Sequence, residues 1–183
     1  MCGITAISAN KEALPFLLQG LEKLEYRGYD SAGITTIEGN HLFTKKAKGR
    51  LQNLKDLLKD ENVLGHVGIG HTRWATHGIP SNLNSHPHTN NDETISLVHN
   101  GIIENYRELK EILILQGYQF HSETDSEVAA ALLNHYYKGD PKEAEAALSY
   151  CNPTIVDVLP LTLEEIFIYE MGGADYEVKD ILL

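Results

Sequence analysis

The sequence is poor in cysteine, since Cys2 and Cys151 are the only two among 183 residues. Two cysteines do not make a disulfide framework. No apolar run approaches the roughly twenty residues of a membrane span. The chain also does not open with a basic segment followed by an apolar stretch, as a signal peptide would. We therefore expect a protein of a reducing, cytoplasmic setting.

Basic residues are also scarce. Fifteen Lys and Arg stand against 26 Asp and Glu, which gives a formal net charge of −11. Such a charge argues against nucleic acid or an anionic membrane as a general partner. The net charge is uneven, because residues 151–183 hold seven acidic residues against one lysine and so carry over half of it. This change predicts one domain over 1–150 and a separate acidic tail over 151–183.

Hydrophobic periodicity predicts a mixture of helices and strands. Leucines at helical spacing indicate a helix that ends near Arg27-Gly28, and Gly39-Asn40 indicates a tight hairpin between two strands. Thr124-x-x-Glu127 is a capping-box signal for a later helix. The class is α+β with antiparallel pairing. The expected strands are 3–8, 33–38, 41–46, 67–72, 95–99 and 154–159, and the expected helices are 14–27, 50–58, 104–115, 126–137, 141–148 and a short one from 162.

Cys2 is the first candidate for chemistry. If Met1 is removed, Cys2 carries both a thiol and a free α-amine, so one residue supplies a nucleophile and a base. The reference pKa values of the two groups, about 7.7–8.0 and about 8.5, make proton exchange between them cheap near neutral pH. The alternative is an ordinary small apolar residue that follows a translation start.

Three polar positions near predicted element ends are further candidates. Arg73 can bind a carboxylate through two parallel hydrogen bonds, or it is a structural arginine. Asn100-Gly101 can present an amide donor beside a backbone N–H and so form an oxyanion hole, or it is a tight turn. Asp125 can hold a substrate ammonium, or it is an acid at a helix N-terminus.

Histidines are concentrated in one stretch, with four of the nine at positions 71, 77, 86 and 88. Metal binding is one interpretation. However, the spacing lacks the i, i+4 helical pair of a zinc-hydrolase motif, which favours hydrogen bonding within a loop. Trp74 is interpreted as a packing residue that stiffens the same loop.

Taken together, these candidates suit the hydrolysis of an amide in a small zwitterion. Glutamine offers an α-carboxylate for Arg73, an α-ammonium for Asp125 and a side-chain amide for Cys2. Asn100 and the N–H of Gly101 would hold the tetrahedral oxyanion. A γ-glutamyl thioester and ammonia would follow.

Six strings carry a family resemblance: Cys2-Gly3-Ile4, YRGYDSAG (26–33), GHTRWATHG (70–78), NSHPH (84–88), HNGIIENY (99–106) and SETDSEV (122–128). They resemble the class II glutamine amidotransferases. Within that family, the likeness is greatest to the glutaminase domain of enzymes that make glucosamine 6-phosphate from fructose 6-phosphate. It implies an N-terminal-nucleophile αββα sandwich, in which two antiparallel sheets lie between helical layers.

The resemblance also implies roles for single residues. Cys2 would be nucleophile and base, with Asn100 and Gly101 as the oxyanion hole. Arg27 and Gly28 match a segment that lies beside the N-terminal cysteine. The glutamine-binding residues would be Arg73, Thr76, His77 and Asp125, with Trp74 closing over the site. No metal or other cofactor is implied for this half-reaction.

The resemblance covers about residues 2–149. Several strands of the family sandwich and the sugar-isomerase domains have no counterpart here. The string LPLTLEEIFIYEMGG (159–173) resembles the C-terminal end of an ABC-transporter ATP-binding subunit, which suggests a truncated or fused reading frame. Because missing strands leave apolar faces and sheet edges uncovered, we expect marginal stability or self-association. A catalytically inactive fragment is the alternative to an active glutaminase.

Overall fold

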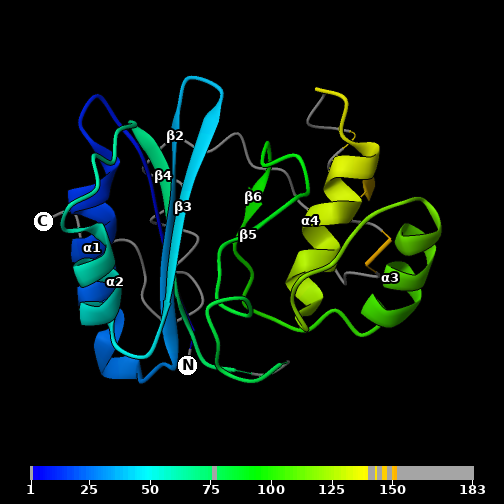
Figure 1. Ribbon diagram of the computed structural model, residues 1–183, viewed down its shortest axis with the longest axis horizontal. Coiled ribbons are helices and arrows are strands. Elements are labelled where there is room, and N and C mark those ends of the chain that lie inside the picture. Colours follow the sequence, from blue (N-terminus) through cyan, green and yellow to red (C-terminus); the bar gives the residue numbers. More distant parts are fainter. Residues whose placement is uncertain (1, 76–77, 140–142, 144–145, 148–149, 152–183) are drawn as a thin grey trace, which may run out of the picture.

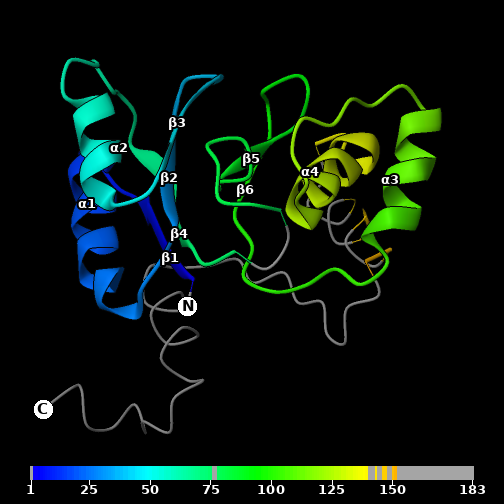
Figure 2. The same ribbon diagram turned by 60° about the horizontal axis from the view of Figure 1, so that its bottom comes forward.

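The computed structural model describes residues 2–75, 78–139, 143, 146, 147, 150 and 151. Its elements form layers (Figures 1 and 2). Two helices cover the outer face of a four-stranded sheet. A small second sheet lies on the other side, followed by two more helices. This order of layers is the αββα sandwich that the sequence predicts, with a second sheet that has only two strands among the described residues.

The four-stranded sheet is antiparallel, with strand order β1-β4-β2-β3. Its strands are β1 (Gly3–Ser8), β2 (Ser31–Glu38), β3 (His41–Lys48) and β4 (Val67–Arg73). The turn at Gly39-Asn40 joins β2 to β3, as predicted, with Gly39 at φ +58°. The covering helices are α1 (Ala13–Leu24) and α2 (Leu51–Leu58), and the 3₁₀ turn η1 (Glu25–Arg27) extends α1.

Leucines hold these helices to the sheet. Leu17 and Leu21 of α1 and Leu54 of α2 are fully buried against Ile34 of β2. Each such side chain contributes roughly 1.5–3 kcal/mol of burial free energy. Glycine at position 70 of β4 lets α1 lie close, because a Cβ there would stand 3.3 Å from Leu21 Cδ1 and 2.8 Å from Thr5 Cγ2.

The opposite, inner face of this sheet is polar at one end. Side chains alternate along a strand, so His71 and Arg73 of β4 share that face. The register pairs Gly3 with Thr72, which places Cys2 beside Arg73 at the end of the ladder. Gly33, paired with His71, lets a loop from the second sheet approach, since a Cβ there would stand 2.2 Å from the His86 carbonyl oxygen.

The second sheet pairs β5 (His88–Thr89) with β6 (Ser96–Leu97). Behind it lie α3 (Tyr106–Leu115) and α4 (Asp125–Tyr136). A second hydrophobic cluster joins α3 and α4, separate from the cluster under α1 and α2. A hydrogen bond of 2.9 Å from Ser96 Oγ to Thr35 Oγ1 crosses between the two sheets. The contact between the sheets therefore includes a direct polar link.

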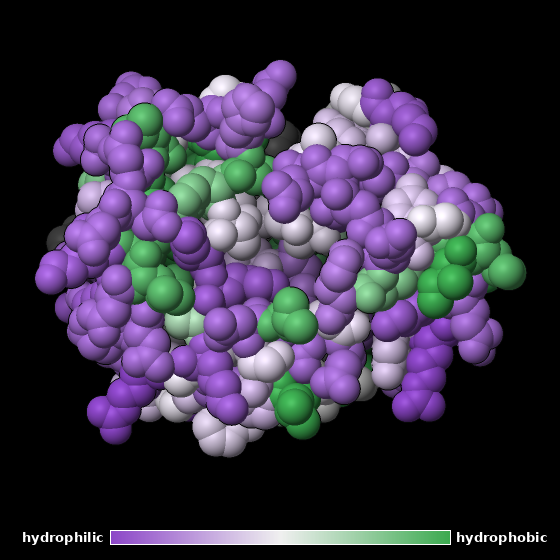
Figure 3. Space-filling model, in the orientation of Figure 1, coloured by the Kyte–Doolittle hydropathy of each residue, from purple (hydrophilic) through white to green (hydrophobic). Residues whose placement is uncertain are grey.

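Apolar side chains also reach the surface. Leu115 is 88% exposed at the end of α3, and Ile112 and Ile114 of the same helix are more than half exposed. The face drawn in Figure 3 is mostly hydrophilic, with hydrophobic residues in several separate places, one of them over α3 at the right. Within the described part of the chain, no helix is long and apolar enough to cross a membrane.

The sequence predictions of the first sheet and of four helices are confirmed to within a few residues. The Thr124 hydroxyl accepts a 3.4 Å hydrogen bond from the Glu127 N–H, which confirms the capping signal. The strand predicted at 95–99 is too long, because only Ser96 and Leu97 pair and the N–H of His99 donates to His86 Nδ1 at 3.3 Å. Most of the helix predicted over 141–148, and all predicted elements beyond 152, lie outside the described residues.

Candidate active site

A cavity of about 360 Å³ opens where the inner face of the first sheet meets the loops before α3 and α4. It is lined by Cys2, His71, Arg73, Trp74, His86, His99, Asn100, Gly101, Thr124, Asp125 and Ser126. Five of the sequence-predicted residues that carry the proposed chemistry are among them: Cys2, Arg73, Asn100, Gly101 and Asp125. They come from positions up to 123 residues apart in the chain.

Cys2 lies at the start of β1 and is partly exposed. Its sulfur accepts a hydrogen bond from the backbone N–H of Trp74 at 3.2 Å. This contact fixes the sulfur beside the end of β4. The thiol is therefore both accessible from the cavity and held in place, as a nucleophile must be.

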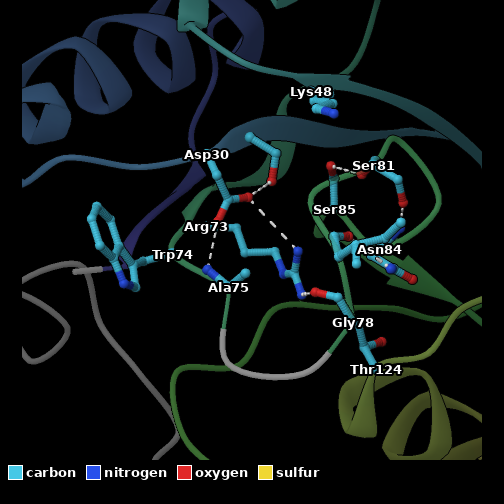
Figure 4. Close-up of polar contacts among 12 residues, drawn as sticks. Asp30, Lys48, Arg73, Trp74, Ala75, Gly78, Ser81, Asn84, Ser85 and Thr124 are labelled. Carbon is cyan, nitrogen blue, oxygen red and sulfur yellow. Dashed lines mark hydrogen bonds and ion pairs between the residues drawn. The ribbon is translucent and has the colours of Figure 1, made fainter.

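Arg73 is the last residue of β4, not a residue just past the strand as the sequence suggested. Its side chain is buried, and its guanidinium donates to the Gly78 carbonyl oxygen at 3.0 Å. Asp30 Oδ1 lies 3.7 Å from the other terminal nitrogen. Figure 4 shows the guanidinium lying between these two partners. A buried cation at the cavity wall favours an anionic ligand group.

Asn100 and Gly101 follow the second sheet and precede α3. The side-chain oxygen of Asn100 lies 2.7 Å from His71 Nε2. A Cβ on residue 101 would stand 2.7 Å from His99 Nε2, so a side chain there would press on that imidazole. The backbone at Gly101 therefore borders the cavity without a side chain to cover it.

Asp125 begins α4, so the interpretation as a helix N-terminal acid describes its position correctly. It is also 4% exposed and lines the cavity. Its Oδ2 accepts a hydrogen bond from the N–H of Ile103 at 2.8 Å. This bond ties the segment that follows Asn100-Gly101 to α4. The Ser126 hydroxyl lies 3.5 Å from the other carboxylate oxygen.

The remaining predicted residues are less central. Trp74 is 56% exposed, so it is not the packing residue that the sequence suggested. A Cβ on Gly28, at φ +72°, would stand 3.3 Å from the Trp74 ring, which places Gly28 beside the cavity wall. Arg27 is exposed, and its guanidinium lies over the Tyr26 ring. Neither Arg27 nor Gly28 lines the cavity. Thr76 and His77 lie outside the described residues.

The described histidines of this stretch do not share one loop. His71 belongs to β4, as the predicted strand 67–72 implies, whereas His88 belongs to β5, which corrects the prediction of a loop at that position. The rings of His71 and His86 stack with centroids 4.3 Å apart, and His88 meets His86 edge-on at 4.7 Å. Among the described residues, no group of three or more His, Cys, Asp or Glu is arranged to hold a metal ion.

Burial keeps these imidazoles neutral. It lowers the pKa of His71 to about 4, and the nearby Arg73 adds to this effect despite the hydrogen bond with Asn100. Burial also lowers the pKa of His86 and of His88 well below the ordinary value, with further lowering from the positive charge of Arg73. The pKa of His99 is lowered by burial and raised in part by Asp125.

Neutral buried histidines predict acid sensitivity of the fold. An unfolded histidine takes up a proton near pH 6.5, whereas native His71 does so only near pH 4. Stability is therefore fully present above pH 6.5 and is lost as the pH falls towards 4. The loss is at most about 1.4 kcal/mol per pH unit for each such histidine. Urea unfolding at pH 7.5, 6.5 and 5.5 should show this fall.

Two variants test the assignment. His71→Gln should make the dependence on pH less steep. His66→Gln, which changes an exposed histidine, should leave it unaltered. A free energy of unfolding that stays constant between pH 7.5 and 5.5 would contradict the burial of neutral imidazoles.

Sequence reasoning did not assign His99, Thr124 or Ser126 to the cavity. It considered His71 and His86 as possible metal ligands and favoured hydrogen bonding within a loop for them. One signal was available, because Arg73 follows the predicted strand 67–72 directly. If the extended backbone continues by one residue, His71 and Arg73 share a face. The placement of Thr124 and Ser126 follows from how α4 meets the second sheet, which no local pattern encodes.

Comparisons with known proteins agree with this geometry. A family model described as "Glutamine amidotransferase domain" matches residues 71–152. The chain therefore carries a glutamine amidotransferase domain. Among curated relatives, glutamine–fructose-6-phosphate aminotransferase (isomerizing) of Clostridium tetani is 60% identical over 144 residues, and that of Methanosarcina mazei is 53% identical over 148. These matches cover 79% and 80% of the chain and 24% of each relative.

A solved structure extends the comparison to an amidotransferase with a different name. Glutamine phosphoribosylpyrophosphate amidotransferase from B. subtilis superposes with a TM-score of 0.67 at 29% sequence identity. The superposition covers 82% of this chain and 33% of the other. With respect to the curated relatives, the chain spans about a quarter of their length.

Proposed function

We propose that this amidotransferase hydrolyses the side-chain amide of L-glutamine to L-glutamate and ammonia. One observation carries the proposal. Cys2, Arg73, Asn100, Gly101 and Asp125, each assigned to glutamine chemistry from the sequence, line a single cavity. A thiol, a buried cation, an amide beside a bare backbone N–H and a carboxylate are the groups that amide transfer from an amino acid requires.

The substrate is proposed to lie in the cavity with its amino-acid group at Arg73 and Asp125 and its side-chain amide at Cys2. The Arg73 guanidinium binds the α-carboxylate, and Asp125 binds the α-ammonium with the carboxylate oxygen that faces Ser126. Thr76 and His77, which follow β4 in the sequence, are proposed to assist. Trp74 with Gly28 and Arg27 closes the side nearest the cysteine. The amide carbon then reaches Cys2.

The reaction has two steps, formation of a thioester and its hydrolysis. The Cys2 sulfur attacks the amide carbon and its proton passes to the α-amine of Cys2, which Met1 removal exposes. The tetrahedral oxyanion is held by Asn100 and the Gly101 N–H. The amine then protonates the leaving nitrogen, the C–N bond breaks and ammonia departs. Water attacks the thioester, transfers a proton back to sulfur and releases glutamate.

In the longer protein that such a domain serves, the ammonia is proposed to convert fructose 6-phosphate to glucosamine 6-phosphate. The support is the identity to relatives named for that aminotransferase. The matched quarter of those relatives corresponds to the glutamine side of the reaction. The low cysteine content of the chain favours a cytoplasmic setting for this reaction.

Turnover of L-glutamine by the purified chain tests the proposal. We expect glutamate release that saturates with glutamine. L-asparagine, one methylene shorter, should react at least about tenfold more slowly in kcat/KM, because its amide falls short of Cys2. If the folded chain releases no glutamate above the uncatalysed rate, the alternative of an inactive fragment holds.

We also propose that the chain self-associates. Within the described residues, β1 and β3 are the outer strands of the first sheet, and the second sheet has two strands. Apolar side chains of α3 add an exposed patch. Unpaired edges and apolar patches promote association. Light scattering should give a mass above 20.4 kDa that rises with concentration. A concentration-independent monomer would contradict this.

A further inference from the structure

His71 lies at the centre of the inner face of the first sheet. Its register partners are Ile4 of β1 and Gly33 of β2, and its side chain is fully buried. One ring face stacks on His86 at 4.3 Å between centroids. His71 also lines the cavity, as does Arg73, two residues later in the same strand. The proposed mechanism gives His71 no role.

The two ring nitrogens of His71 have different surroundings. Nε2 lies 2.7 Å from the side-chain oxygen of Asn100. Nδ1 is buried and has no hydrogen-bond partner among the residues that the structure describes. A neutral imidazole carries one proton, on one nitrogen or the other. The surroundings therefore decide which tautomer is present.

The tautomer with the proton on Nε2 satisfies this geometry. A buried N–H without an acceptor is costly and rare, so Nδ1 is better left as a lone pair. The proton then lies on Nε2, which must donate to an acceptor. The only acceptor on the Asn100 side chain is its oxygen. The amide NH₂ of Asn100 consequently points away from His71.

We propose that His71 is a positioning residue whose Nε2–H holds the Asn100 oxygen and so turns the Asn100 NH₂ into the cavity, where it stabilises an oxyanion. This proposal rests on the proposed glutaminase function. A reversed amide would direct its oxygen at the developing negative charge and remove the donor. Because burial lowers the pKa of His71 to about 4, the ring is neutral at pH 7 and retains the single proton that the arrangement needs.

Kinetics of three variants test the role. Since loss of one oxyanion donor lowers kcat by about 10²–10³, we expect His71→Leu to lower kcat at least about tenfold with KM within about twofold. His71→Gln places an amide N–H near Nε2 and should stay within about fivefold of the parent. In an Asn100→Ala background, His71→Leu should change kcat less than about twofold. Effects that multiply, or a change confined to KM, would overturn the proposal.

A second measurement does not depend on activity or on a variant that folds poorly. Long-range ¹⁵N–¹H spectra of the histidine-labelled chain report which ring nitrogen carries the proton, and His71→Gln identifies the signal. We expect neutral His71 with the proton on Nε2 at pH 7. A proton on Nδ1 would overturn the positioning role even if glutamine is hydrolysed. An Nε2–H signal in a chain without turnover would support the geometry while contradicting the proposed function.

Discussion

Cys2→Ala is expected to lower glutamine hydrolysis at least about 10⁴-fold, because the substitution removes the atom that forms the thioester and with it the two-step route. KM for residual turnover has no reason to rise, since Arg73 and Asp125 still line the cavity. Glutamate release by the purified variant, compared at equal concentration of folded protein, is the measurement. Thermal unfolding of both proteins shows that the comparison is between folded chains.

The second cysteine supplies the matched control. Cys151 packs beside the cluster of α3 and α4 and does not line the cavity. Cys151→Ala should therefore keep the parent activity within about twofold. If Cys2→Ala retains turnover, or if Cys151→Ala loses it, the assignment of the nucleophile is wrong.

Asn100→Ala has the next largest expected effect. Removing one donor of an oxyanion hole typically raises the barrier by about 2.7–4 kcal/mol, so kcat should fall about 10²–10³-fold. KM should change little, because the amide is proposed to bind the transition state rather than the ground state. Steady-state kinetics with glutamine separate the two constants.

Asn91→Ala is the control for this substitution. Asn91 is exposed, and it exchanges hydrogen bonds with the backbone of Gln119, outside the cavity lining. We expect parent kinetics from Asn91→Ala. An Asn100→Ala enzyme with unchanged kcat would exclude an oxyanion hole at this position, and a change in KM alone would reassign Asn100 to substrate binding.

Much of the first sheet was predictable because its signals are local. Leucine spacing along α1, the Gly39-Asn40 turn and the alternation of Val67 and Ile69 with glycine in β4 each lie within one segment. The Thr124 capping signal is equally local, and it placed the start of α4 within one residue. Hydrophobic periodicity and the residue types of turns predict such features directly.

The pairing of distant segments was not predictable from such patterns. The cavity depends on β1 lying beside β4, which brings together Cys2 and Arg73 from 71 positions apart. Nothing in either segment specifies the other as its neighbour. The connection came instead from the chemistry of a glutamine ligand, which needs both groups in one site, and from the family resemblance, which assigns both positions to that site.

In the second sheet, the sequence pattern predicted more strand than the structure has. Apolar residues over 95–99 predicted a full strand, but two residues pair, and His99 leaves the ladder to bond His86. A short β5 offers few partners, so the side-chain bond competes successfully with the ladder. The boundary near residue 150 stays a prediction, since 152–183 lie outside the described residues.

The proposed reaction requires that the processed chain begins with a cysteine whose sulfur carries the glutamyl group. Mass spectrometry of the N-terminal peptide, taken from chains quenched in acid during glutamine turnover, detects this group. We expect a peptide that starts at Cys2 with one γ-glutamyl group on the sulfur. A peptide that retains Met1 and stays unmodified while glutamate accumulates would contradict the proposed reaction.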